Sequence, residues 1–172
     1  MTAELNYCPQ CGTKLIMKYL PTEGKEIQYC ETCGDFRFPI FSAAVSMVVE
    51  SADRSRILLI RQYGRPSWIL PAGYINKGED AEDAVKRELM EELGLETEEI
   101  RFNRTRYFPP SNVLMLNYMA RVKDMPVNPN WEVDEWQWFT REEARKNIRP
   151  ASLAEQFLTG YLDRPKTEKE ED

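Results

Sequence analysis

Short runs of apolar residues predict β-strands in the main body of the chain. Residues 43–49 and 56–60 are apolar and rich in branched side chains, and the polar stretch between them predicts a hairpin. Further candidate strands are residues 101–108, 113–122 and 135–139. The segments that begin at Thr140 and Ser152 each open with a hydrogen-bond acceptor and carry Glu three residues later, the capping-box pattern of a helix start.

A longer amphipathic helix is predicted from Asp80 to Leu93. Its apolar residues recur at four-residue steps and form a narrow stripe suited to packing on a sheet; they are Ala81, Val85, Leu89 and Leu93. Gly94 can adopt the left-handed conformation that ends a helix. Strands followed by helices predict an α/β (α+β) sandwich, in which helices flank a mixed sheet.

Three glutamates of this helix lie close to its apolar stripe. With Val85 at zero and about 100° per residue, Glu92 lies at about −20°, Glu88 at about −60° and Glu91 at about −120°. A solvated acidic face would lie opposite the stripe, and like charges at these spacings cost helix stability. A bound cation explains the cluster better, and carboxylate oxygens select Mg²⁺, Mn²⁺ or Ca²⁺ over zinc.

The segment before the helix suits a phosphate ligand. Residues 70–73 lead into a short loop, and a strand–loop–helix unit presents backbone N–H groups and the positive helix end beside the carboxylates. Metal ions and exposed amides together neutralise a diphosphate and orient a water for in-line attack.

Four cysteines form two C-x2-C pairs near the amino terminus, Cys8 with Cys11 and Cys30 with Cys33. This spacing is typical of a tetrathiolate zinc site, which has a structural role because no coordination position stays open. Disulfides are the alternative, but they are rare in reducing compartments. A redox C-x-x-C would need one pair beside a βαβ unit rather than two matched pairs.

Composition narrows the chemistry further. The 172 residues include 29 acidic and 23 basic side chains and no histidine, for a net charge of −6. The chain as a whole therefore lacks a cationic surface for nucleic acid, and histidine-based catalysis is excluded. The sequence begins without a basic, apolar leader and has no apolar run of about 20 residues, so a cytoplasmic protein without a membrane partner is expected.

These patterns divide the chain into three parts. We expect a zinc ribbon at residues 1–38, a catalytic domain at residues 39–163 and a disordered charged tail at residues 164–172. No internal repeat is visible.

The glutamate helix and its preceding loop resemble the Nudix box, G-x5-E-x7-R-E-U-x-E-E-x-G-U with U aliphatic. Every fixed position matches, namely Gly73, Glu79, Arg87, Glu88, Leu89, Glu91, Glu92, Gly94 and Leu95. The resemblance implies an α/β/α sandwich and cleavage, dependent on Mg²⁺ or Mn²⁺, of a nucleoside diphosphate linked to another group.

The resemblance also implies residue roles. Glu88, Glu91 and Glu92 would bind the catalytic metal, with one of them a candidate water-activating base, and Gly73 would offer its carbonyl oxygen. Glu79 and Arg87 would pair to hold the loop on the helix. A further ligand or base is expected from Glu135, with Glu132 as the second candidate and an ordinary exposed strand residue as the alternative.

The four-cysteine ribbon followed by this box resembles the NADH pyrophosphatase branch of the family. That branch carries the array S-Q-P-W-P-F-P-x-S-L-M, and here the corresponding stretch is TRYFPPSNVLM, residues 105–115. Phe108, Pro109, Leu114 and Met115 match the aromatic and proline character of the array, but T-R-Y replaces S-Q-P and Val113 replaces the second serine. Pro110 also fits a loose marker of ADP-ribose pyrophosphatases.

Tyr74 takes the place where the branch stacks a nicotinamide or base, and Tyr107 and Phe108 are further candidates, with core packing as the alternative for each ring. The leading hypothesis is hydrolysis of NADH-type dinucleotides to two mononucleotides, one of them AMP. Rival substrates are ADP-ribose, another nucleotide sugar and NAD-capped RNA. A nucleotide-sensing binding module is the non-enzymatic rival. Relatives of this branch pair, which implies a homodimer.

Overall fold

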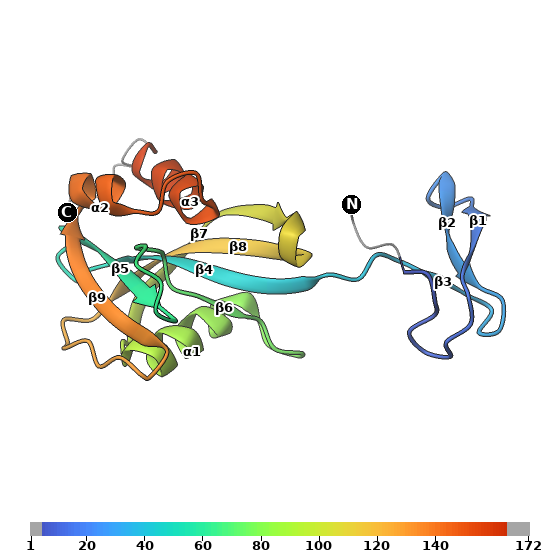
Figure 1. The fold of residues 1–172 in the computed structure, drawn as a ribbon, viewed down its shortest axis with the longest axis horizontal. Coiled ribbons are helices and arrows are strands. Elements are labelled where there is room, and N and C mark those ends of the chain that lie inside the picture. The colour runs from blue at the N-terminus through green and yellow to red at the C-terminus, as the bar shows by residue number, and fades with distance from the viewer. Residues whose placement is uncertain (1–4, 165–172) are drawn as a thin grey trace. The chain divides into compact units, whose positions relative to one another are not determined.

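The computed structural model describes residues 5–164 (Figure 1). The chain divides into two compact units, one formed by the residues up to Ser42 with Pro109–Val113, and the other by Ala43–Phe108 with the residues from Leu114 onward. No helix within the described residues is long and apolar enough to span a bilayer. The predicted charged tail lies outside the described residues, apart from its first position, Arg164.

The first unit contains a three-stranded antiparallel sheet made of β1 (Ile16–Leu20), β2 (Lys25–Cys30) and β3 (Asp35–Arg37). Each cysteine pair lies in a tight turn that a glycine closes. The N–H of Gly12 donates to Cys8 O at 2.8 Å, and that of Gly34 donates to Cys30 O at 2.9 Å. Both glycines have positive φ, 74° and 70°, a conformation that side chains disfavour.

The second unit is built on a six-stranded sheet with the order β7-β8-β4-β5-β9, in which β6 also pairs with β4. The strands are β4 (Ser42–Glu50), β5 (Arg56–Gln62), β6 (Ala72–Tyr74), β7 (Thr97–Phe108), β8 (Val113–Val122) and β9 (Val133–Thr140). The predicted hairpin is confirmed, because β4 and β5 pair antiparallel. Since β8 and β4 run in the same direction (Figure 1), the sheet is mixed.

Three helices cover the two faces of this sheet, α1 (Ala81–Leu93) on one side and α2 (Arg141–Asn147) with α3 (Leu153–Leu162) on the other (Figure 1). Side chains that alternate along the central strands explain this arrangement. Leu58 and Ile60 of β5 pack in the core with α1, whereas Ile57 and Leu59 pack in the core with α2 and α3. The predicted α/β/α sandwich is thereby confirmed.

The helix ends follow the sequence signals. Gly94, at φ 65°, ends α1. Its N–H donates to the Met90 carbonyl oxygen at 3.0 Å, and the Leu95 N–H donates to that of Leu89 at 3.1 Å. Thr140 and Glu143 form the complete capping box of α2. At α3 only half of the predicted box forms: Ser152 accepts from the Glu155 N–H, but the Glu155 carboxylate accepts from the Ala151 N–H at 2.7 Å instead of from Ser152.

Candidate active site and cysteine cluster

The three box glutamates of α1 differ in exposure. Glu92 is buried with only 5% of its surface exposed, beside the apolar residues that pack α1 on the sheet. The Glu88 side chain is 12% exposed and that of Glu91 is 58% exposed. The helix therefore presents its carboxylates in a graded series from core to solvent, which agrees with their positions beside the apolar stripe.

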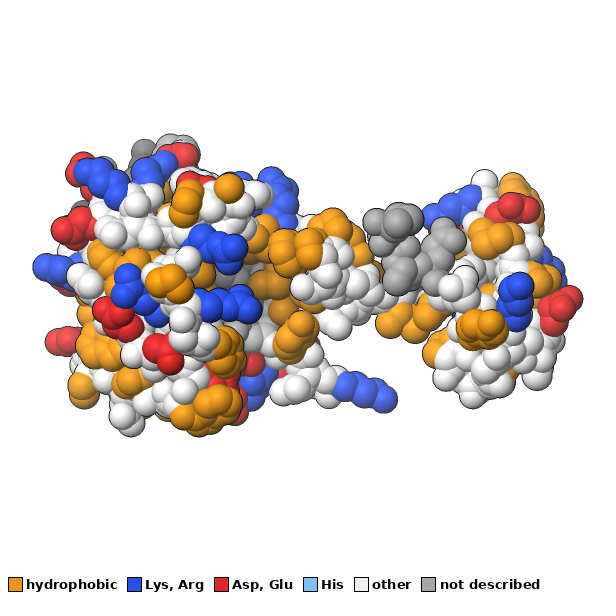
Figure 2. All heavy atoms as spheres, in the orientation of Figure 1, with side chains coloured by type: hydrophobic (Ala, Val, Ile, Leu, Met, Phe, Trp, Pro, Cys, Tyr) orange, Lys and Arg blue, Asp and Glu red, His pale blue; other side chains and the backbone are white. Residues whose placement is uncertain are grey.

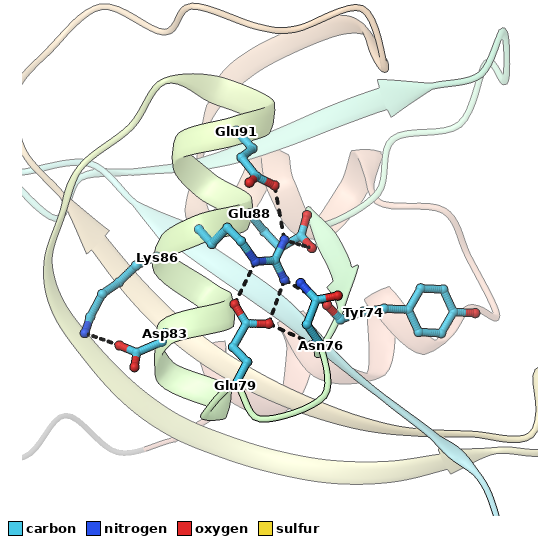
Figure 3. Close-up of polar contacts among 8 residues, drawn as sticks. Tyr74, Asn76, Glu79, Asp83, Lys86, Glu88 and Glu91 are labelled. Carbon is cyan, nitrogen blue, oxygen red and sulfur yellow. Dashed lines mark hydrogen bonds and ion pairs between the residues drawn. The ribbon is translucent and has the colours of Figure 1, made fainter.

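Arg87 holds the loop and the helix together (Figure 3). Its guanidinium donates to both carboxylate oxygens of Glu79, at 2.7 and 2.9 Å, and to the Tyr74 carbonyl oxygen at 2.9 Å. It also donates to Glu88 at 2.7 Å and Glu91 at 3.1 Å. All five N–H donors of the arginine are thus used. Sequence reasoning identified the Glu79 pair but not the two contacts with the other glutamates.

Glu79 is fixed from a second side by the Asn76 N–H, which donates to its carboxylate at 2.9 Å. The Arg87 hydrogen bond, followed by that of Asn76, lowers the pKa of Glu79 to about 2. The pair is therefore ionised at neutral pH and clamps the loop between β6 and α1.

Gly73 approaches Glu88 so closely that no side chain fits there. A Cβ at this position would overlap the Glu88 carboxylate, and the φ of Gly73 is not in the left-handed region, so the glycine provides space rather than conformational freedom. Gly73 lies in β6 opposite Val45 of β4. The sheet therefore fixes the backbone against which the Glu88 carboxylate rests.

Glu92 is the most perturbed carboxyl group of the cluster. Burial, followed by the negative charge of Glu88, raises the pKa of Glu92 to about 7, while the nearby Gln62 side chain opposes the shift. Within residues 5–164 neither Glu92 Oε2 nor Gln62 Nε2 has a hydrogen-bond partner, although both atoms are buried. A buried oxygen without a donor costs free energy, and a cation would satisfy it.

Glu132 and Glu135 have different surroundings at the start of β9. Glu135 lies opposite Arg61 in the sheet, and the two side chains form an ion pair at 2.5 Å. Glu132 accepts a hydrogen bond of 2.6 Å from the Tyr63 hydroxyl, which raises the pKa of Tyr63 to about 12. The negative charge of Glu132 also raises the pKa of Glu92, so Glu132 lies close enough to act on the carboxylate cluster.

Gln62 and Tyr63 are residues that sequence reasoning did not single out. They follow the apolar run of β5, and no motif marks an isolated glutamine or tyrosine at a strand end. Only the register of β5 with β9, in which Gln62 lies opposite Val133, could have brought them toward the glutamates.

The candidate stacking residues are not core residues. Tyr74 is 60% exposed, and Tyr107 and Phe108 are each 38% exposed. The Tyr74 ring points away from Arg87 and the carboxylates, whereas its backbone carbonyl binds Arg87 (Figure 3). These exposures exclude complete burial in the core, which was the alternative explanation for each ring.

The four cysteines of the first unit converge. All four are free thiols, and their sulfur atoms lie within 4.8 Å of one another. Cys8 and Cys33 are 3.9 Å apart and Cys11 and Cys30 are 3.4 Å apart, close to the separation of about 3.8 Å that zinc–sulfur bonds of about 2.3 Å impose on a tetrahedron. Arg37 Nε donates to the Cys8 sulfur at 3.3 Å. The set fits one tetrahedral metal ion.

The family model of the NUDIX domain matches residues 41–157, and the chain belongs to this family. It is 34% identical over 155 residues to Nudix hydrolase 19, chloroplastic, of Arabidopsis thaliana, which covers 84% of the chain. It is also 26% identical over 170 residues to the NAD-capped RNA hydrolase NudC of Vibrio parahaemolyticus, which covers 94% of the chain.

The fold agrees with a solved NUDIX hydrolase from Nitrosomonas europaea, with a TM-score of 0.67 and 20% identity over 94% of this chain and 95% of that one. The curated relatives are longer. The chain spans 34% of the Arabidopsis protein and 63% of the Vibrio protein.

Proposed function

We propose that this NUDIX protein is a metal-dependent pyrophosphohydrolase that cleaves the diphosphate of an NAD-type dinucleotide, either free or at the 5′ end of an RNA. The observation that carries the proposal is the buried, unpartnered Glu92 carboxylate oxygen beside Glu88, which a hard cation would satisfy. The names of the Vibrio and Arabidopsis relatives support the reaction class and the substrate class.

Glu88, Glu91 and Glu92, together with the Gly73 carbonyl oxygen, would hold Mg²⁺ or Mn²⁺. These ligands fit such an ion because all are oxygens and because Gly73 leaves no side chain between the β6 backbone and Glu88. The bound ion supplies neutralisation of the diphosphate charge and activation of water. We propose Glu135 as a further ligand or base, as the resemblance implies, with Glu132 as the second candidate. Glu132 is held by the Tyr63 hydroxyl at 2.6 Å.

The chain's own groups then carry the reaction. Water adds to one phosphorus, its proton passes to a carboxylate of the cluster, and the bond from that phosphorus to the bridging oxygen breaks, so that two monophosphates leave. Arg87 acts as a positioning residue because all five of its donors are already used within the protein. Tyr74, Tyr107 and Phe108 would stack on the nicotinamide or the base.

The cysteine cluster would hold a structural Zn²⁺. Its four sulfurs complete a tetrahedral shell and leave no position for substrate. Such a site is consistent with the reducing cytoplasm, which we propose as the compartment. We also propose a homodimer, and a mass measurement in solution that gives only monomer at micromolar concentration would contradict it.

The substrate is tested by incubating the protein with Mg²⁺ or Mn²⁺ and NADH, NAD⁺, ADP-ribose, a diadenosine polyphosphate or NAD-capped RNA, followed by chromatography of the products. We expect AMP and a nicotinamide mononucleotide from the free dinucleotide, and a 5′-monophosphate RNA from the capped one. Preferred cleavage of ADP-ribose would contradict the substrate. Tight nucleotide binding without product would contradict the enzymatic proposal and favour a sensing module.

A further inference from the structure

A basic groove lies between β7 and α3, on the face of the sheet opposite α1. It has a volume of about 530 Å³, within the range of small-molecule sites. Three arginines line it, Arg104 and Arg106 from β7 and Arg164 after α3. Its other lining residues are Gln156, Thr159, Gly160 and Asp163. The groove is therefore strongly basic in a protein whose net charge is −6.

The positive charge of the groove is not neutralised within the part of the chain that the structure describes. There, none of the three guanidinium groups forms an ion pair, and the single lining carboxylate, Asp163, is paired with Arg145 at 2.6 Å. Among the described residues, the hydrogen bonds of the three arginines end on backbone carbonyl oxygens. On the face of the second unit seen in Figure 2, acidic and basic side chains are interspersed.

Arg104 is held in place by the fold. Its Nη2 donates to the Gly160 carbonyl oxygen at 3.1 Å, and its buried Nε has no partner among the described residues. A Cβ at Gly160 would overlap the guanidinium group. Glycine inside a helix is less favourable than alanine, so α3 carries a destabilising residue at the position where the Arg104 guanidinium lies. This is a built position rather than a freely solvated side chain.

We propose that this groove binds phosphate groups, those of a nucleotide or of an RNA chain, at a place separate from the carboxylate cluster. Guanidinium groups suit phosphate because they offer paired donors in a fixed plane. Gln156 and Thr159 add neutral hydrogen-bonding groups along the same wall. The site does not depend on the hydrolytic activity and is tested without it.

Binding is measured by calorimetry at low salt without added Mg²⁺ or Mn²⁺, so that the carboxylate cluster lacks its catalytic ion while the cysteine cluster stays intact. The titrants are inorganic pyrophosphate, ADP and a ten-nucleotide single-stranded RNA. We expect the double variant Arg104→Gln with Arg164→Gln to bind at least tenfold more weakly than wild type. The Arg149→Gln variant, an exposed arginine outside the groove, is the control and should change binding less than twofold.

Gly160→Ala keeps every charge and raises helix propensity. It therefore tests the effect of displacing the Arg104 guanidinium without a change in net charge or a loss of helix stability. We expect it to weaken binding about threefold without lowering the melting temperature. Unchanged affinity in both the double variant and Gly160→Ala would overturn the proposal, as would absence of binding to wild type by all three titrants. All variants should keep wild-type turnover of a free dinucleotide, whatever its identity.

The three titrants distinguish the sources of phosphate. Binding of pyrophosphate and ADP identifies a small phosphate ligand, whereas binding of RNA alone identifies a phosphodiester chain. In the RNA case the slope of log K against log salt should fall by about 1.4 in the double variant, since each lost contact with a single strand contributes about 0.7.

Discussion

The two candidate metal sites are assembled in opposite ways. The four sulfurs of the cysteine cluster come from two C-x2-C pairs and lie within 4.8 Å of one another. The carboxylate cluster takes its side chains from one helix but relies on β6, on Arg87 and on burial to orient them. The cysteine cluster takes four ligands from two short sequence pairs and leaves no coordination position open. The carboxylate cluster leaves positions open and depends on tertiary contacts. A site whose coordination positions are all filled by protein suits a structural ion, and a site with an open position suits catalysis.

The largest effect is expected from Cys30→Ser, because Cys30 is fully buried and would supply one of the four proposed zinc ligands. Structural zinc contributes roughly 10–16 kcal/mol of binding free energy in small zinc domains, so the loss of one thiolate should unfold the ribbon. Zinc content should fall from one per chain to nearly none, and amide protection of β1–β3 should disappear in hydrogen exchange. Retained zinc and protection would show that the ribbon does not need a closed shell.

The same comparison predicts a different response from Glu92→Gln. This isosteric change removes the buried carboxylate charge, and turnover should fall on the order of 10³-fold because a proposed ligand of the catalytic metal is lost. The melting temperature should not decrease, since burying a neutral amide costs less than burying a charge. Glu96→Gln, which alters an exposed partner of Lys123, is the control. Wild-type turnover by Glu92→Gln would remove this glutamate from the site.

Gly73→Ala tests how far the open site depends on its backbone. The added Cβ would displace the Glu88 carboxylate, and a displacement of about 1 Å can cost on the order of 10²-fold in rate. Gly78→Ala is the matched control, because it strains the loop backbone at φ 84° but meets no atom within 4 Å. We expect the control to lose some stability and keep its turnover. An equal loss of rate in both variants would attribute the effect to the loop backbone.

The sequence predicted the residues of the cysteine cluster more completely than the surroundings of the carboxylate cluster, for physical reasons. The cysteine spacing identified all four residues that converge, and the helical period sufficed to place Glu92 in the apolar arc. The surroundings of Gln62 and the hydrogen bond from Tyr63 to Glu132 arise from the pairing of β5 with β9, which joins residues about 70 positions apart. Nothing local encodes such a pairing.

The same limit applies to Gly160 and Arg104. A glycine near the end of a helix is typically a stop signal, and only the packed structure shows that this one makes room for a guanidinium group from β7. The apolar runs of β4 and β5 and the helices expected beside them, by contrast, were sufficient to predict the sandwich, because a sheet that is apolar on both faces requires cover on both.

The smallest effect concerns the clamp between Glu79 and Arg87, which supports the open site without belonging to it. The pKa of Glu79 lies at about 2 in the folded protein, below its ordinary value of 4.5. A lowered carboxyl pKa stabilises the fold above the unfolded value, and this contribution is lost as the pH falls from about 4.5 toward 2. The stability difference between wild type and Glu79→Gln should therefore be constant near neutrality and shrink in that acidic window.

Denaturant unfolding of both proteins at a series of pH values measures this difference. In an Arg87→Gln background the same Glu79→Gln change should lose most of its pH dependence, because the cation that lowers the pKa is absent. An undiminished pH dependence in that background would assign the effect to the Asn76 N–H instead. The clamp would then be a property of the loop alone, and the open site would resemble the cysteine cluster more closely in its local origin.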